Sequence, residues 1–339
     1  MMYETNTKFN QFLLFLFLLF IANMTNVIAN FLIILYTIYV NNMEKKNLTI
    51  KDSSIGLVTS FLFSQIAVVI VYCIGYIISS MIGLASEDIA IFFSNCYGYA
   101  LLAFAMQFTI AMTYFFFSRN KDNKIIPAPK SKKLLVYIII AIASFFALYP
   151  LINCIDSLLQ DWGIRINTIS YELNSTSYIV SLFSLVILPA ICEELLFRGL
   201  IFKGLKPYGK YFSIIVSSLL FAIYHMSLSQ AVYPFLLGLL LSLIMYHENS
   251  IVYCIAVHMT NNFLSLTLSY ANISLVFNHW TYLLLALVLF AIFIVAVMYF
   301  MIKKVKSTEK TKISREELIY FTISITIMIV FYIISCISN

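Results

Sequence analysis

The chain has 339 residues, of which 62% are hydrophobic and only 11% are charged, with a formal net charge of +6. A soluble globular domain is nearer half apolar and a quarter charged, so no single soluble core could bury this much apolar surface. The composition predicts a polytopic membrane protein. It excludes a secreted disulfide scaffold, a disordered chain and a soluble nucleic-acid binder. The six cysteines show no C-x-x-C spacing, so we interpret them as small apolar residues.

Ten apolar runs are candidate transmembrane spans, since a helix needs about 20 apolar residues to cross the hydrocarbon. The expected fold class is therefore an all-α bundle of about ten transmembrane helices. In chain order the runs cover about 11–40, 55–84, 89–118, 134–153, 177–202, 211–228, 231–247, 251–270, 279–302 and 318–337.

Basic residues predict the orientation, because cytoplasmic loops carry an excess of Lys and Arg. In a ten-span layout all but two of the 21 Lys and Arg residues fall on one side, and the exceptions are Lys8 and Arg165. We therefore expect that side to be cytoplasmic and both termini to lie outside. The chain is expected to be a multi-pass protein of the cell membrane.

Ionisable residues inside spans are informative, because each costs about 2.5–3.5 kcal/mol at a helix centre on insertion scales. Spans 5, 6 and 8 carry ionisable groups, namely Glu193, Glu194, Arg198, His225 and His258, and span 8 also carries the amide of Asn262. At a rise of 1.5 Å per residue, Glu193, His225 and His258 lie about 15, 21 and 10 Å from one end of their spans. Ordinary helix tilt can therefore bring them to a similar depth.

Helical spacing predicts which of these groups share a face. Glu194 and Arg198 are i,i+4 neighbours and can form an ion pair, which lowers the cost of burying both. Glu193 points about 100° away and is free for another partner. His258 and Asn262 also share one helix face. A carboxylate, imidazoles and an amide that converge in a wet cavity can activate water and stabilise an oxyanion.

Each group also has a purely structural interpretation. Glu194 and Arg198 can serve as a structural ion pair, and a histidine in a span can serve as an interhelical hydrogen-bonding residue. His247 and His279 lie at span ends, where we expect no chemistry. The hydrolytic interpretation gains weight from the combination of complementary groups on three neighbouring spans.

Three motifs in order resemble a known family: Glu-Glu-x-x-x-Arg at 193–198, Phe-x-x-x-His at 221–225 and His-x-x-x-Asn at 258–262. They are similar to the CPBP family, which contains CAAX proteases and bacteriocin-processing enzymes. The resemblance covers about residues 177–266, in a predicted protease core over 134–270. Spans 1–3 within 1–133 and spans 9–10 within 271–339 lie outside it.

The resemblance implies an intramembrane endopeptidase whose cavity opens to the cytoplasm. Glu193 would activate water with help from His225, while His258 and Asn262 would stabilise the oxyanion. The family is often described as metalloproteases, which makes Glu193, His225 and His258 candidate zinc ligands. The chain has no His-Glu-x-x-His motif, yet two His and one Glu form an accepted catalytic zinc set, so both mechanisms stay open.

The resemblance also gives the Glu194 and Arg198 pair a supporting role. The implied partners are membrane lipid and a peptide or membrane-protein substrate, with no nucleic acid. Bacteriocin or pheromone processing and self-immunity are the biological roles it implies. A hypothesis from another class is a non-catalytic membrane protein, for immunity or scaffolding, that binds a peptide or partner.

Overall fold

The computed structural model describes residues 47–83, 85–118, 130–163, 174–228, 230–271, 280–302 and 311–338. The regular structure within these residues is helical throughout, which confirms the predicted all-α class. Among the described residues, six helices are long and apolar enough to cross a membrane, as expected for a multi-pass membrane protein. They are α2 (Ile50–Met81), α4 (Cys96–Ser118), α5 (Ser131–Asp161), the helical run Ser175–Tyr208, α11 (Ile251–Tyr270) and α13 (Arg315–Cys336 within Arg315–Ser338).

The predicted count of about ten spans is not reached in the described part of the chain. α9 (Lys210–Tyr224) and α10 (Val232–Glu248), predicted as spans 6 and 7, have only 15 and 17 residues. α9 ends four residues before its predicted limit because Met226 has a positive φ of 50°. α12 (Trp280–Ile302) coincides with predicted span 9. The first predicted run, 11–40, lies outside the described residues, as do Lys8 and Arg165.

Predicted span 3 is two helices, α3 (Ser86–Ser94) and α4, separated at Asn95. The Asn95 side chain accepts hydrogen bonds from the backbone N–H groups of Tyr97 and Gly98, at 2.9 and 3.1 Å. Such capping by asparagine starts a new helix. A Cβ at Gly98 would lie 2.3 Å from the carbonyl oxygen of Phe92, so the close turn requires glycine. Predicted span 4 is also longer than expected, since α5 continues to Asp161.

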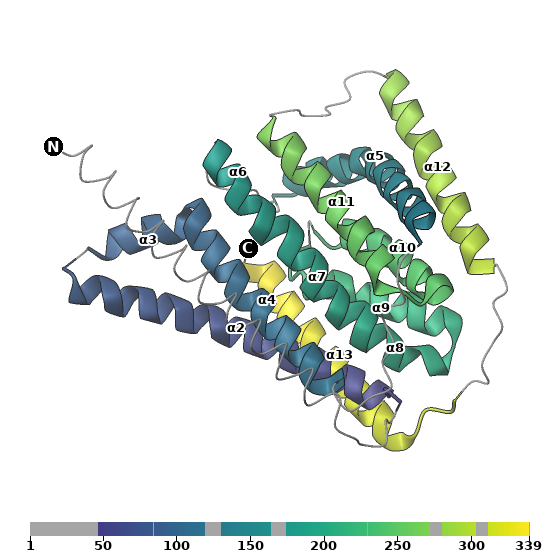
Figure 1. The fold of residues 1–339 in the computed structure, drawn as a ribbon, viewed down its shortest axis with the longest axis horizontal. Helices are drawn as coiled ribbons and strands as arrows, with labels where there is room; N and C mark the ends of the chain where they lie inside the picture. The colour runs from purple at the N-terminus through teal and green to yellow at the C-terminus, as the bar shows by residue number, and fades with distance from the viewer. Residues whose placement is uncertain are drawn as a thin grey trace.

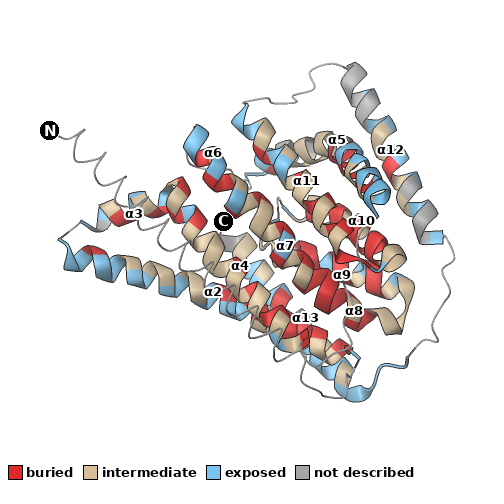
Figure 2. Cartoon of the chain, in the orientation of Figure 1, coloured by how far each residue is buried: buried red, intermediate tan, exposed pale blue. Residues whose placement is uncertain are grey.

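The run Ser175–Tyr208 crosses the middle of the bundle (Figure 1). Its central helix α7 (Leu188–Glu194) packs against α4 and against α11. From there α4 packs on α2 and α2 on α13, while α11 packs on α5 and α5 on α12. Figure 2 shows buried residues gathered around α8 (Phe202–Leu205), α9 and α10, whereas much of α2 is exposed. The core therefore surrounds the segment that carries the predicted site.

Small residues let α2 approach the central run closely, as is common between membrane helices. Ser53 is buried, and its hydroxyl donates to the carbonyl oxygens of Leu200 and Ile201 at 3.3 and 3.2 Å. Gly204 faces the same contact, where a Cβ would lie 2.0 Å from Ser53 Oγ and 2.5 Å from Thr49 O. The two helices can meet here only because position 204 has no side chain.

Gly204→Ala is therefore expected to lower the thermal unfolding temperature of the purified protein by several degrees. Overpacking of a close contact costs about 1–3 kcal/mol, and backbone at Thr49 cannot swing aside. Gly75→Ala is the matched control, because its Cβ would meet only the Phe93 ring, at 2.9 Å. Equal unfolding temperatures for the two variants would contradict the proposed close contact.

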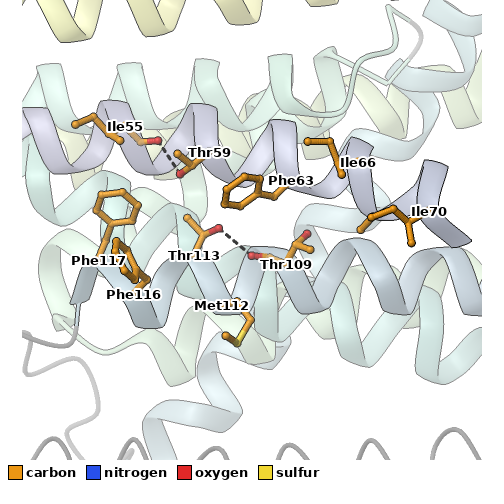
Figure 3. A pocket seen from close by; sticks show the side chains of 11 residues that line it. Ile55, Thr59, Phe63, Ile66, Ile70, Thr109, Met112, Thr113, Phe116 and Phe117 are labelled. Atoms are coloured by element: carbon orange, nitrogen blue, oxygen red, sulfur yellow. Dashed lines mark hydrogen bonds between the residues drawn. The ribbon is translucent and has the colours of Figure 1, made fainter.

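A groove of about 690 Å³ lies between α2 and α4 (Figure 3). Its lining is apolar apart from Thr59, Thr109 and Thr113. The hydroxyls of Thr59 and Thr113 donate to carbonyl oxygens of their own helices, at 2.8 Å each (Figure 3). None of the predicted site residues lines this groove, so the candidate site lies elsewhere.

Candidate active site

Three predicted site residues lie on one irregular stretch of the central run. α6 (Ser175–Ser181) is followed by a π-helical segment, η1 (Leu182–Ile187), and then by α7 with Glu193 and Glu194. A second π-helical segment, η2 (Leu195–Ile201), carries Arg198 and leads into α8 and a last turn, η3 (Lys206–Tyr208). π-Helical turns within α-helices are frequent at functional sites. The π-helical turns thus lie in the same stretch in which the ionisable residues predict a functional site.

The predicted ion pair between Glu194 and Arg198 is present and fully buried. Arg198 Nη1 donates to Glu194 Oε1 at 2.8 Å, and both side chains are 0% exposed. His258 joins the pair from α11, with its Nδ1 2.9 Å from the same Glu194 oxygen. Arg198 Nη2 also donates to the carbonyl oxygen of Gly238 on α10, at 3.3 Å. One buried network therefore ties three helical segments together.

The Phe221 ring on α9 contacts the guanidinium of Arg198 and two imidazoles. The Arg198 guanidinium stands 4.5 Å from the ring centroid, within cation–π range. The imidazoles of His225 and His258 both meet this ring edge to face, at centroid distances of 4.9 and 5.8 Å. The ring thus brings the two predicted histidines to the same place, which confirms that spans 6 and 8 converge.

Glu193 lies apart from this buried network and is half-buried. Its Oε1 accepts a hydrogen bond of 3.0 Å from Nε2 of Gln107 on α4. Among the described residues, no hydrogen bond or ion pair joins Glu193 to His225 or His258. The adjacent glutamates therefore have different surroundings, as their 100° separation on the helix predicts.

Both imidazoles have a defined donor at Nδ1. A carbonyl oxygen can only accept, so His225 must donate from Nδ1 to Phe221 O, at 2.8 Å. The Glu194 carboxylate likewise makes Nδ1 the donor atom of His258. Nε2 is then the nitrogen that each ring can offer to a substrate. His225 is half-buried and His258 is 3% exposed.

Asn262 takes a position that the proline in α7 explains. Pro189 has no N–H, so it cannot donate to the carbonyl oxygen of Leu185 one turn earlier. Asn262 Nδ2 donates to that carbonyl oxygen at 3.1 Å. The amide carries a second N–H that this bond does not use. Asn262 therefore anchors α11 to the central run and keeps one donor for another partner.

The proposed zinc ligands do not form a metal site as the structure places them. Across the described residues, no three His, Cys, Asp or Glu side chains lie together in an arrangement that could hold a metal ion. The misfit lies in how the three side chains are placed, because the hydrogen bond from His258 Nδ1 to Glu194 leaves its Nε2 available. The donor set therefore does not fit zinc, and we derive no step through a metal.

Sequence reasoning missed three contributors to the site. Gln107, Phe221 and Gly238 act through contacts between helices that are distant in the chain. Gln107 does carry a signal, since it is an amide within an apolar run, but no ionisable residue or family motif lies beside it as one does beside Asn262. Phe221 is the first residue of the Phe-x-x-x-His motif, where it has no predicted role, and Gly238 carries no side chain that could signal a contact.

Comparison with known families identifies this part of the chain. Residues 175–264 match the family model described as Rce1-like, type II CAAX prenyl endopeptidase Rce1-like. The match includes all six predicted site residues and nearly coincides with the predicted segment 177–266. No curated protein and no solved structure matches the chain. The predicted resemblance is thus confirmed over this segment, since residues 175–264 of this membrane protein are similar to the Rce1-like family of CAAX prenyl endopeptidases.

Proposed function

We propose that the protein is an intramembrane endopeptidase that hydrolyses a peptide bond of a membrane-associated protein or peptide. The observation that carries the proposal is the contrast between the two adjacent glutamates. Glu194 is fully buried and its Oε1 is bonded to Arg198 and to His258, whereas Glu193 is half-buried and, among the described residues, is bonded to a neutral amide. Glu193 is therefore the carboxylate that is available to take a proton.

The proposed reaction moves one proton through Glu193. The carboxylate removes a proton from water as the oxygen attacks the peptide carbonyl carbon, and the carbonyl oxygen becomes an oxyanion. The C–N bond then breaks, and the same proton passes from Glu193 to the leaving nitrogen. His225 assists by accepting a hydrogen bond from the attacking water at Nε2, its unprotonated nitrogen.

The oxyanion is stabilised by the amide of Asn262 and by His258. The second N–H of Asn262 is one donor, because the first is bonded to Leu185 O. His258 donates from Nε2 when its ring carries both protons, with Nδ1–H held by Glu194. Glu194 and Arg198 hold His258 in place and have no direct role in the chemistry.

The surrounding charge supports the orientation, and the similarity to CAAX prenyl endopeptidases supports the substrate class. The run that carries Glu193 ends in Lys203 and Lys206, and Lys210 begins α9. By the positive-inside rule this end faces the cytoplasm, so we place the opening of the site there. The substrate class is prenylated or otherwise membrane-associated peptides, within which bacteriocin and pheromone precursors or self-immunity targets are candidates.

Replacement of either histidine tests the proposal. The assay is cleavage of a fluorogenic farnesylated CAAX peptide by purified protein in proteoliposomes. His225→Ala and His258→Ala are each expected to lower kcat/KM at least tenfold, or about 1.4 kcal/mol in the barrier. His247→Ala at the end of α10 is the control and should stay within twofold. Wild-type rates in both site variants would overturn the assignment.

A further inference from the structure

Gln107 extends the site beyond the segment that the family model covers. It lies on α4, where only 7% of the residue is exposed, and it reaches across to α7. Its Nε2 donates to Glu193 Oε1 at 3.0 Å, between residues 86 positions apart. A buried amide thus contacts the carboxylate that serves as the general base in the proposed function.

The orientation of this amide is fixed by its partner. A carboxylate only accepts hydrogen bonds, so the nitrogen of Gln107 must face Glu193. Gln107 Oε1 is then buried, with no hydrogen-bond partner among the described residues. A buried acceptor without a partner destabilises the fold, because its lost hydration is not replaced. For stability alone, an apolar side chain of the same length would serve better at this position.

α4 also limits how the amide can move. This helix packs against α7 and against η2, the stretch that carries Glu193 and Arg198. A side chain held between packed helices loses little further conformational freedom when it forms a hydrogen bond. Supporting residues can therefore fix the position of catalytic ones. Glu193 has no ion-pair partner among the described residues, so this hydrogen bond is its polar anchor.

We propose that Gln107 is a positioning residue that holds the Glu193 carboxylate in line with the attacking water. The inference rests on the proposed function for its effect on rate. A purely structural interhelical hydrogen bond predicts a different result, since its removal would lower stability and leave the kcat of the folded enzyme unchanged.

Gln107→Met separates the two interpretations, because methionine keeps the length of the side chain and removes both polar atoms. The measurements are kcat and KM for the farnesylated CAAX peptide in proteoliposomes and the thermal unfolding temperature. We expect kcat to fall about tenfold, KM to stay within twofold, and the unfolding temperature to equal or exceed that of wild type. Gln107→Asn keeps the amide one methylene shorter and should give an intermediate kcat, which covers the case in which the methionine variant does not fold.

Thr113→Val is the matched control on the same helix. Thr113 is buried and its hydroxyl donates to its own helix at Thr109 O, at 2.8 Å. This change removes a buried polar group without reaching Glu193, so kcat should stay within twofold. An unchanged kcat in Gln107→Met, or an equal loss in Thr113→Val, would overturn the positioning role.

Infrared difference spectroscopy tests the contact without any substrate. Subtraction of the Glu193→Gln spectrum from the wild-type spectrum isolates the carboxylate band of Glu193. We expect this band to shift in Gln107→Met and to stay in place in Thr113→Val. A band unmoved by Gln107→Met would overturn the inference even if the peptide is cleaved. If wild type leaves the peptide intact, the proposed function fails, and the band still decides whether Gln107 holds Glu193.

Discussion

Glu193→Gln is expected to lower peptide cleavage by about 10²–10⁴-fold, the usual contribution of general acid–base catalysis. Glutamine has nearly the same volume but cannot take a proton from water. The variant should fold, because position 193 lies outside the buried ion pair and its side-chain oxygen can still accept from Gln107 Nε2. The measurement is kcat with the farnesylated peptide, normalised to folded protein.

Glu248→Gln is the control for the loss of a carboxylate as such. Glu248 lies at the end of α10, where it accepts hydrogen bonds from Lys133 Nζ and Tyr137 Oη. Its replacement should leave kcat within twofold. If Glu193→Gln retained near wild-type kcat, Glu193 could not be the general base.

Glu194→Ala is expected to cause the largest loss of folded protein. Arg198 cannot lose its proton, and it is fully buried. Removal of one partner from a buried ion pair costs about 3–5 kcal/mol, because the other charge is left uncompensated. The carbonyl oxygen of Gly238 and the Phe221 ring would be the remaining contacts of the guanidinium. The measurement is the yield of monodisperse protein extracted in detergent.

Addition of Arg198→Leu to Glu194→Ala should restore part of this yield, since it removes the stranded charge. Activity should not return, because His258 has lost the acceptor that fixes its Nδ1. Glu193→Ala should reduce activity with a smaller loss of yield. The account of the two glutamates is wrong if Glu193→Ala reduces yield more than Glu194→Ala and the double variant recovers nothing.

The sequence was sufficient for features that depend on short-range chemistry. The Glu194–Arg198 pair follows from i,i+4 spacing and from the cost of an uncompensated charge in lipid. The same reasoning separated Glu193 from its neighbour. α11 was also located to the residue, since its apolar run 251–270 begins directly after the polar pair Asn249 and Ser250.

Contacts between distant helices could not be read from the sequence. The hydrogen bonds of His258 to Glu194 and of Gln107 to Glu193 span 64 and 86 residues. They depend on how helices are rotated against one another, which hydropathy does not record. Hydropathy also overlooked the break at Asn95, because the flanking residues on both sides are apolar. α9 likewise ends four residues before the predicted limit of span 6, whereas α10 agrees with predicted span 7 to within one residue.

The most direct test measures binding and cleavage in the same sample, because the alternative function is a membrane protein that binds a peptide without cutting it. Wild type and Glu193→Gln, in equal folded amounts in proteoliposomes, are incubated with the farnesylated CAAX peptide. Mass spectrometry then follows bound intact peptide and its products over time. We expect wild type to convert the peptide by hydrolysis at one bond, and Glu193→Gln to bind it and leave it intact. Wild type that binds the peptide and leaves it intact, like the variant, would contradict the enzymatic account.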